Sequence, residues 1–192
     1  MKLFLIMKTD LSKFTIGEYR NGSKLKVFIW YFINYYIFNT AFPWPYKIKI
    51  TLLRIFGAKV GAGVVLKTKV RIKNPWRLTI GENTWIGEGV WIDNLEDVNI
   101  GSNVCLSQDA MLLTGNHDYT KVDFPYRLGS INLEDGVWVG AKSVVCPGVT
   151  CRSHAILTVN SVATRELKQW GIYSGNPAVL VRERKLIETP GN

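Results

Sequence analysis

The sequence predicts an all-β fold in which the chain winds into a triangular coil of short parallel strands. The first observation is a repeat of six residues that places an apolar residue at a fixed position, often followed by Gly. The second is a small or β-branched residue four places after that position. The third is an extra two residues after every third repeat in the first half of the series, so that three repeats make one circuit. Stacked units of this kind are typical of solenoid proteins, in which no single unit buries its apolar face alone.

Short strands separated by corners account for the repeat. One inward-facing residue on each strand gives the apolar position, and Gly eases the corner that follows. The repeat positions are Val60, Leu66, Ile72, Ile80, Ile86, Ile92, Ile100, Leu106 and Leu112, then Leu133, Val139, Val145, Cys151, Leu157 and Ala163, which is enough for about five coils. A helix is disfavoured because each Gly costs roughly 1 kcal/mol in a helix interior. An ordinary β-sandwich would show turn signals about every 8 to 12 residues instead.

The length of 192 residues fits one domain with appendages. We expect residues 57–166 to form the domain of coiled parallel strands. An irregular excursion loop at about 114–131 interrupts the six-residue repeat within it. Residues 1–56 form a basic and apolar N-terminal segment. Residues 167–192 form a C-terminal extension that we expect to be a short helix or tail.

Cysteine usage and the N-terminus predict the compartment. Cys105, Cys146 and Cys151 lie at or beside repeat positions and lack the spacing of metal ligands. We therefore interpret them as reduced packing residues in a reducing compartment. The apolar run at residues 1–7 is too short for the core of a signal peptide and lacks a small-residue cleavage site. These features predict a cytoplasmic protein.

Basic charge is concentrated in the N-terminal part of the chain. Residues 1–78 contain 15 Lys and Arg against two acids, whereas residues 79–192 contain 9 against 13. The basic part includes an apolar stretch, residues 27–42, which is shorter than the roughly 20 residues of a membrane-spanning helix. Two interpretations remain open: a helix that caps the coil stack, or an interfacial helix on the inner face of an anionic membrane. No recognition-helix pattern or RNA-binding motif accompanies the charge, so we expect no nucleic acid partner.

Several motifs follow one another in an order that resembles a known family. They are the runs at 80–87 (IGENTWIG), 100–104 (IGSNV), 114–119 (TGNHDY), 137–141 (VWVGA), 145–150 (VCPGVT) and 173–178 (YSGNPA). Across residues 43–182 the chain resembles the hexapeptide-repeat acyltransferases, and among them the O-acetyltransferases of exopolysaccharide synthesis of the colanic acid type. The resemblance implies a left-handed parallel β-helix and a homotrimer with active sites between neighbouring subunits.

His117 is the candidate catalytic residue. It lies five residues past the repeat position Leu112, where a side chain points outward, and on the excursion. A neutral imidazole can take the proton of a sugar hydroxyl as the oxygen attacks a thioester carbonyl, so no covalent intermediate is needed. The resemblance gives the histidine of this motif the same base role. Asp118, Asp93 and Asn94 are candidates to orient His117 or to hold the acceptor, although each would equally suit a plain turn.

The resemblance implies acetyl-CoA as the donor, bound along the last coils. It places main-chain contacts at Ala141 and Val159 and a further contact at Thr164. Arg182 would meet the phosphates, because the planar guanidinium group binds phosphate oxygens with two hydrogen bonds. The alternative for residues 182–185 is the solvated face of a C-terminal helix.

Three tryptophans, Trp85, Trp91 and Trp138, also lie five residues past a repeat position and so point outward. Exposed large aromatic side chains mark interfaces. We expect these three at contacts between subunits rather than stacked on a sugar or adenine ring.

The predicted function is therefore transfer of an acetyl group from acetyl-CoA to a hydroxyl of a saccharide, such as an exopolysaccharide, an O-antigen or a lipid-linked glycan precursor. N-acetylation of an amino sugar nucleotide is the nearest alternative, but a basic, aromatic N-terminus fits an acceptor at an anionic membrane surface better. A non-catalytic scaffold or membrane tether is the alternative outside enzymes. Zinc chemistry on the same scaffold would need three His ligands, and the chain has only His117 and His154, so we expect no metal.

Overall fold

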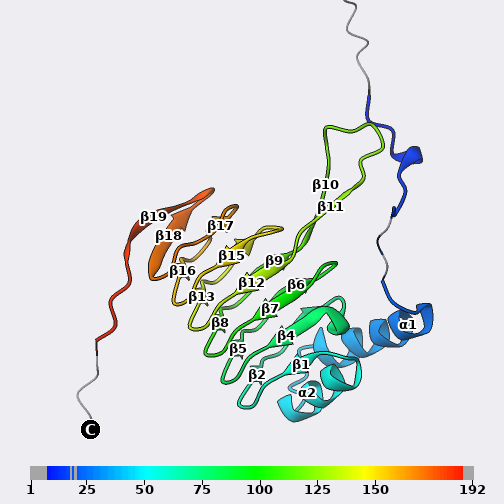
Figure 1. Cartoon of the computed structure of the whole chain (residues 1–192). Helices are drawn as coiled ribbons and strands as arrows, with labels where there is room; N and C mark the ends of the chain where they lie inside the picture. The colour runs from blue at the N-terminus through cyan, green and yellow to red at the C-terminus, as the bar shows by residue number, and fades with distance from the viewer. Residues whose placement is uncertain (1–7, 18, 20, 188–192) are drawn as a thin grey trace, which may run out of the picture.

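The computed structural model describes residues 8–17, 19 and 21–187, most of which wind into a three-sided prism of stacked parallel strands (Figure 1). Residues 1–7, where a signal peptide would begin, lie outside the described residues. Sheet A contains β1 (Lys59–Val60), β4 (Leu78–Ile80), β7 (Val98–Ile100), β12 (Ile131–Leu133) and β15 (Thr150–Cys151). Sheet B contains β2 (Val65–Leu66), β5 (Trp85–Ile86), β8 (Cys105–Leu106), β13 (Trp138–Val139), β16 (Ile156–Leu157), β18 (Gly171–Gly175) and β19 (Ala178–Glu183). Sheet C contains β3 (Arg71–Ile72), β6 (Trp91–Asp93), β9 (Met111–Leu113), β14 (Val144–Val145) and β17 (Val162–Ala163).

The chain visits the sheets in the order A, B, C, which gives five complete coils. A sixth coil begins after β17, where Leu167 bridges Cys151 and β18 pairs in parallel with β16, so the coil number is slightly higher than the expected five. The C-terminal extension differs from the short helix or tail expected. It forms an antiparallel hairpin, β18 and β19, because the open edge of β16 offers backbone partners that an extended segment can use.

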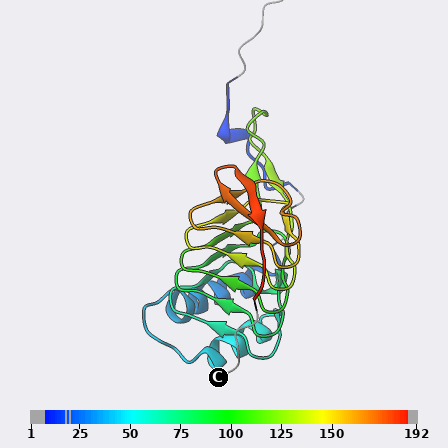
Figure 2. The ribbon, with the colours of Figure 1, turned by 90° about the vertical axis from the view of Figure 1, so that its left-hand side faces the viewer.

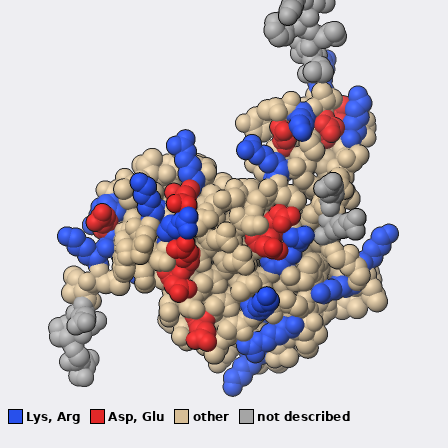
Figure 3. Space-filling view, in the orientation of Figure 1, with Lys and Arg blue, Asp and Glu red and all other residues tan. Residues whose placement is uncertain are grey.

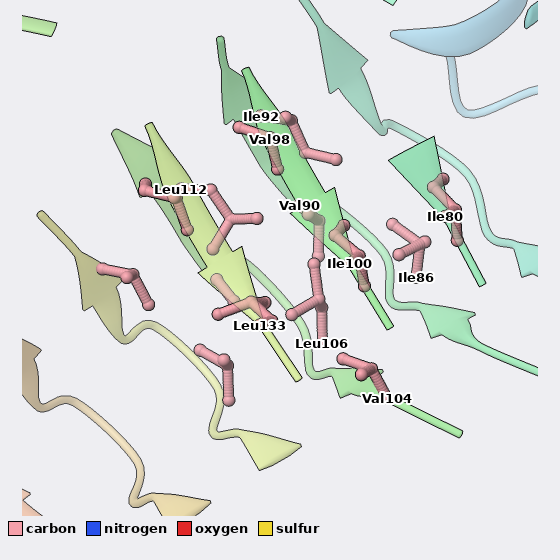
Figure 4. Packing of buried hydrophobic residues seen from close by; sticks show 14 of the residues in the cluster. Ile80, Ile86, Val90, Ile92, Val98, Ile100, Val104, Leu106, Leu112 and Leu133 are labelled. Atoms are coloured by element: carbon pink, nitrogen blue, oxygen red, sulfur yellow. The ribbon is translucent and has the colours of Figure 1, made fainter. Parts of the chain in front are cut away.

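Residues at the repeat positions fill the interior of the prism, as the sequence predicts. Every repeat position from Leu66 to Ala163 is buried, and so are the small or β-branched residues that stand four places after most of them. The exceptions are Trp76, Glu96 and Asn116, which are half-buried or exposed. In Figure 4 the labelled side chains from the three sheets point towards one another. The buried hydroxyls bond to the next coil: Thr84 Oγ1 donates to the Gly101 carbonyl at 2.8 Å and Ser143 Oγ to the Thr158 carbonyl at 2.7 Å. The prism therefore has one continuous apolar core.

Helices cover the end of the first coil in both views of the ribbon (Figure 1, Figure 2). They are α1 (Lys24–Ile33), the π-helical turn η2 (Asn34–Phe38) and α2 (Tyr46–Ile55). Trp30 of α1 is buried and donates its indole N–H to the Ile72 carbonyl at 2.8 Å. Phe38 and Leu53 are fully buried beside it. We call these three elements the cap, because they close an interior that a solenoid would otherwise leave open to water.

Two short 3-10 helices complete the described elements, η1 (Leu11–Lys13) in the N-terminal segment and η3 (Pro75–Arg77) at a corner insertion. In the part of the chain that the structure describes, no helix combines the length and the apolar composition needed to cross a bilayer.

Lys49 of α2 makes the stability of the cap depend on pH. Its side chain is fully buried, donates from Nζ to the Lys67 carbonyl at 2.8 Å, and burial lowers the pKa of its ammonium group. The folded state therefore loses this proton at lower pH than the unfolded state does. We expect the free energy of unfolding to rise as pH approaches about 10, because the buried charge is then relieved. Urea titrations at neutral and alkaline pH should show this rise in the parent and not in Lys49→Met.

Candidate active site

A hairpin leaves the prism at the edge between sheets C and A. It consists of β10 (Gly115–His117) and β11 (Tyr126–Leu128), which pair antiparallel with His117 opposite Tyr126. The excursion is thus ordered, although the sequence predicted an irregular loop. Its base is fixed by Thr114, which is buried and donates from Oγ1 to the Asp93 carbonyl at 2.9 Å. The Gly129 N–H donates to the Thr114 carbonyl at 2.9 Å and closes the hairpin.

The ring of His117 is held in one orientation by Phe124 in the hairpin turn. Nδ1 lies 2.8 Å from the Phe124 carbonyl oxygen, and the two rings stack with centroids 4.4 Å apart. A carbonyl oxygen can only accept, so Nδ1 carries the hydrogen in the neutral ring and Nε2 keeps its lone pair. Phe124 has φ of 49°, a left-handed conformation that is an outlier for a bulky residue. The strained residue is the one that supplies both contacts to the imidazole.

Asp118 stabilises the hairpin turn. Its Oδ1 accepts from the backbone N–H of Thr120 at 3.1 Å and from its hydroxyl at 2.6 Å. These bonds, foremost the one from the Thr120 hydroxyl, hold the pKa of the Asp118 carboxyl below its usual range. The group that contacts Nδ1 of His117 is therefore the Phe124 carbonyl, and Asp118 acts one step away, on the turn that carries Phe124.

Asp93 and Asn94 lie in the coil below the base of the hairpin. Asn94 is fully buried, and its side chain bonds to the backbone N–H and carbonyl of Asn74 at 2.9 and 2.6 Å. The Asp93 carboxylate lies 2.9 Å from the ammonium group of Lys73, so the oxygen is paired by charge although it accepts no hydrogen bond of regular geometry. Asn94 has its polar atoms committed to the corner of the coil. Asp93 is also buried, and its carboxylate is paired with the partly exposed side chain of Lys73.

Two hollows meet at His117. The first, which we call the groove, has a volume of ≈ 430 Å³ and runs from the hairpin along the last coils. It is lined by Asn116, His117, Tyr119, Arg127, Leu128, Gly129, Cys146, Pro147, Gly148 and Thr164. The second, which we call the aromatic hollow, has a volume of ≈ 300 Å³ and is lined by Leu11, Phe14, His117, Phe124 and Tyr126. The imidazole is thus reachable from both hollows.

The N-terminal segment builds one wall of the aromatic hollow. The Asp10 N–H donates to the Val122 carbonyl at 2.8 Å, which ties this segment to the hairpin tip. The Phe14 ring then lies 5.2 Å from that of Tyr126 and 5.7 Å from that of His117. Sequence reasoning missed Phe14, Phe124 and Tyr126. Only tertiary contact brings them together, because Phe14 lies about a hundred residues before the hairpin.

The remaining predicted residues fall on two different edges of the prism. Thr164 shares the groove with His117, at the edge between sheets C and A. Ala141 and Val159 occupy turns at the edge between sheets B and C, one coil apart, where the Asn160 N–H donates to the Ala141 carbonyl at 2.9 Å. Arg182 is exposed on β19, the last strand of sheet B. One chain therefore does not bring all of the predicted donor contacts together with His117.

The cysteines are reduced, and one of them lies in the groove. Cys151 is fully buried, and burial raises the pKa of its thiol to about 12. Cys146 is half-buried in the groove wall, where burial also raises its thiol pKa. His154 is at the opposite edge, between sheets A and B, and its ring stacks on Trp170 at 4.1 Å. Within the described ranges, no three His, Cys, Asp or Glu side chains come together as a set of metal ligands.

Proteins of similar sequence are acetyltransferases, the class of enzyme that the coiled fold and the candidate site indicate. The chain is 34% identical over 176 residues to WcaF of Escherichia coli strain K12, assigned as a colanic acid biosynthesis acetyltransferase, covering 91% of this chain and 97% of WcaF. It is 26% identical over 152 residues to galactoside O-acetyltransferase of the same organism, covering 77% and 74% of the two chains. No protein-family model matches the chain.

Solved structures agree in fold. The hexapeptide-repeat acetyltransferase VCA0836 from Vibrio cholerae, complexed with acetyl coenzyme A, superposes with a TM-score of 0.77 at 22% identity, over 91% of this chain and 98% of that one. Galactoside acetyltransferase in complex with coenzyme A gives a TM-score of 0.74 at 22% identity, over 83% and 80% of the chains. The fold is therefore the left-handed parallel β-helix of the acetyltransferases. From its identity with WcaF over nearly the whole of both chains, this chain belongs to the hexapeptide-repeat acetyltransferase family, colanic acid type, and is an enzyme.

Proposed function

We propose that the protein transfers an acetyl group from acetyl-CoA to a hydroxyl group of a saccharide, with His117 as the general base. The observation that carries the proposal is the hydrogen bond from Nδ1 to the Phe124 carbonyl at 2.8 Å. It leaves Nε2 as the basic nitrogen of a ring that stands where the groove and the aromatic hollow meet. A base placed between two ligand hollows suits direct transfer from one ligand to the other.

The reaction requires one proton relay through Nε2. Nε2 takes the hydroxyl proton as the acceptor oxygen forms a bond to the thioester carbonyl carbon. The tetrahedral intermediate then collapses, the carbon–sulfur bond breaks, and the imidazolium returns the proton to the departing thiolate of coenzyme A. The Phe124 carbonyl accepts a hydrogen bond from Nδ1 throughout, which stabilises the positive charge that develops on the ring.

The separation of the donor contacts supports a homotrimer. His117 and Thr164 lie on one edge of the prism, whereas Ala141, Val159 and Arg182 lie on sheet B or on its edge with sheet C. A neighbouring subunit that presents its B–C edge to the groove would complete a cleft for the long pantetheine arm. In this arrangement Arg182, exposed at the end of the prism, binds the phosphates.

Outward-facing tryptophans support the same arrangement. Trp85 and Trp138 on sheet B are 63% and 45% exposed, which is unusual for side chains of this size on a rigid sheet. Trp91, on sheet C, is half-buried beneath the Arg71 guanidinium group at 4.4 Å. Burial of the two sheet B tryptophans between subunits would remove apolar surface from water.

The aromatic hollow is the proposed acceptor site. Sugars present apolar C–H faces, which pack on aromatic rings, and Phe14 and Tyr126 form such walls beside the base. The acceptor belongs to polysaccharide synthesis, and the protein works in the cytoplasm, where acetyl-CoA is made. The first point is supported by the similarity to WcaF, and the second by the free cysteines and by the need for acetyl-CoA.

The direct experiment is a turnover assay. Purified protein is mixed with acetyl-CoA and bacterial exopolysaccharide fragments, and release of free thiol is followed together with the mass of the glycan. Acceptor-dependent thiol release with a gain of one acetyl group per glycan, removed by mild alkali that leaves amides intact, supports O-acetylation. Acetylation found only on amino groups of sugar nucleotides would overturn it.

Cys146 tests whether the acetyl group passes directly to the acceptor. It is the one thiol lining the groove among the described residues, so an acetyl-cysteine intermediate is the competing route. Burial raises its pKa, so at neutral pH it is a protonated thiol and a poor nucleophile. We expect Cys146→Ser to retain kcat within about threefold, because a nucleophile's loss would cost far more. Mass spectrometry of the parent mixed with acetyl-CoA alone should find no acetylated enzyme; a stable adduct at Cys146 would contradict direct transfer.

A further inference from the structure

The cap has an outer face with an unusual amount of exposed aromatic surface. We call it the outer aromatic face. It consists of Leu25, Phe28, Ile29, Tyr31, Phe32, Tyr35, Tyr36 and Phe42, all exposed and all from α1, η2 or the loop that follows. Phe28, Tyr31 and Phe32 are 61%, 65% and 43% exposed, whereas Trp30 and Phe38 on the inner face are buried. The fold therefore buries only the inner apolar side chains of this segment and leaves the outer ones exposed to solvent.

The exposed rings form one continuous surface. The Phe32 ring contacts that of Phe28 at 5.0 Å and that of Tyr31 at 5.6 Å. It also lies parallel to the Tyr36 ring at 6.5 Å, and Tyr36 contacts Tyr35 at 5.0 Å. Contiguous apolar surfaces on soluble chains mark binding sites, whereas single exposed residues do not. The face therefore has the contiguity that distinguishes a binding surface from single exposed residues.

The charge around this face is of one sign. Between Glu18 and Glu82 the sequence has 12 Lys and Arg and no acidic residue. Several of these cations are used inside the cap: Lys26 lies over the Trp76 ring, Lys49 is buried, and Arg54 donates to the Val60 carbonyl. Lys24, which begins α1, and Lys47, in α2, are exposed and make no ion pair within the described residues. Figure 3 shows Lys and Arg with few acidic neighbours over the cap and first coils.

We infer that the outer aromatic face docks on an anionic lipid bilayer. Its centre is Phe28 and Phe32, and Tyr31, Tyr35 and Tyr36 surround them with rings that carry a polar end. Aromatic rings with polar ends prefer the headgroup level of a bilayer, and flanking Lys residues attract anionic lipids. A second protein would need acidic groups to match these lysines, and a second copy of the cap brings only more positive charge. The bilayer is therefore the partner that the chemistry favours.

The docking surface is connected to the acceptor site through the chain. The N-terminal segment that supplies Phe14 to the aromatic hollow continues within about ten residues into α1. The docked enzyme would hold this segment at the surface where lipid-linked glycans are found. The inference about docking stands without the proposed function, because it concerns a face that does not include His117.

Vesicle co-sedimentation of the full chain tests the inference. One set of vesicles is phosphatidylcholine alone, and the other contains about 30% phosphatidylglycerol, which gives the surface a negative potential. The protein should sediment with the second set only, and about 0.5 M NaCl should weaken binding by screening the lysines. The variant Phe28→Ser/Phe32→Ser should bind at least about tenfold more weakly, because it removes the apolar centre of the face. Lys24→Gln/Lys47→Gln should lose the preference for anionic vesicles.

Leu186→Ser/Ile187→Ser is the matched control. It removes two large apolar side chains that are 62% and 91% exposed in the C-terminal tail, away from the cap, and should bind as the parent does. Circular dichroism and acetyltransferase assays with a water-soluble acceptor check that each variant is folded. Binding of the Phe28/Phe32 variant equal to that of the parent, or no sedimentation of the parent with either vesicle, overturns the inference. So does a larger assembly of the parent that this variant dissociates, because the face would then join protein chains.

Discussion

Replacing His117 by Ala is expected to lower kcat by about 10² or more, because the acceptor hydroxyl then has no base to take its proton. The KM for acetyl-CoA should change little, since the proposed donor contacts are Thr164 in the groove and Ala141, Val159 and Arg182 away from it, none of which this variant alters. Thiol release under saturating donor and acceptor measures both values. A kcat that stays within about threefold of the parent's contradicts the base role, because that loss is smaller than any general base contributes.

Replacement of His154 is the control, because it removes a histidine that lies outside the candidate site. It has an imidazole of the same chemistry, but stacks on Trp170 at another edge of the prism. Its φ of 62° calls for a residue that accepts the left-handed conformation, so His154→Asn is the suitable change. This variant should keep the activity of the parent. A parallel loss of activity in both variants would point to folding rather than chemistry.

Replacing Gly81 by Ala is expected to lower the free energy of unfolding by about 3 kcal/mol or more. A Cβ at this corner would lie 2.5 Å from the carbonyl carbon of Gly101 and the nitrogen of Ser102, which are backbone atoms of the next coil. These atoms cannot move away alone, because the Gly81 N–H already bonds to the Ile100 carbonyl at 2.7 Å. The coils would have to separate at this corner. Urea denaturation followed by circular dichroism gives the difference.

Gly148→Ala separates steric contact from backbone conformation. A Cβ at Gly148 meets no atom within 4 Å, but its φ of 78° is left-handed. The loss should therefore be only about 1 to 2 kcal/mol, from the conformation of the backbone. If the two variants lost equal free energy of unfolding, steric contact with the next coil would not be the reason that position 81 requires Gly.

The repeat made the fold predictable because, in a β-helix, the position of a residue within the six-residue repeat determines whether its side chain is buried. Each strand contributes the same inward position, so Ile86, Leu106 and Val139 could be placed without knowledge of their contacts. The sixth coil was missed because Leu167 and Tyr173 do not continue the step of six. The C-terminal hairpin was missed because its strands pair through backbone groups at an open edge, which leaves little signal in side-chain pattern.

The candidate site could be predicted only where its residues lie in a sequence motif. His117 could be singled out because it interrupts the repeat, and Thr164 lies with it in the groove. The contact to Nδ1 comes from a main-chain carbonyl, which any residue at position 124 carries and no sequence pattern announces. Phe14 reaches the hollow through the packing of the N-terminal segment on the hairpin. Contacts of this kind depend on tertiary structure alone.

A crystal structure of the protein with coenzyme A tests the central claim most directly. We predict that the thiol sulfur lies between two subunits, within about 4 Å of Nε2 of His117, where a single proton transfer can join them. The pantetheine arm should follow the groove past Thr164 and meet Ala141 and Val159 of the neighbouring subunit. A coenzyme bound on a face of a single chain, with its sulfur remote from His117, would contradict the account.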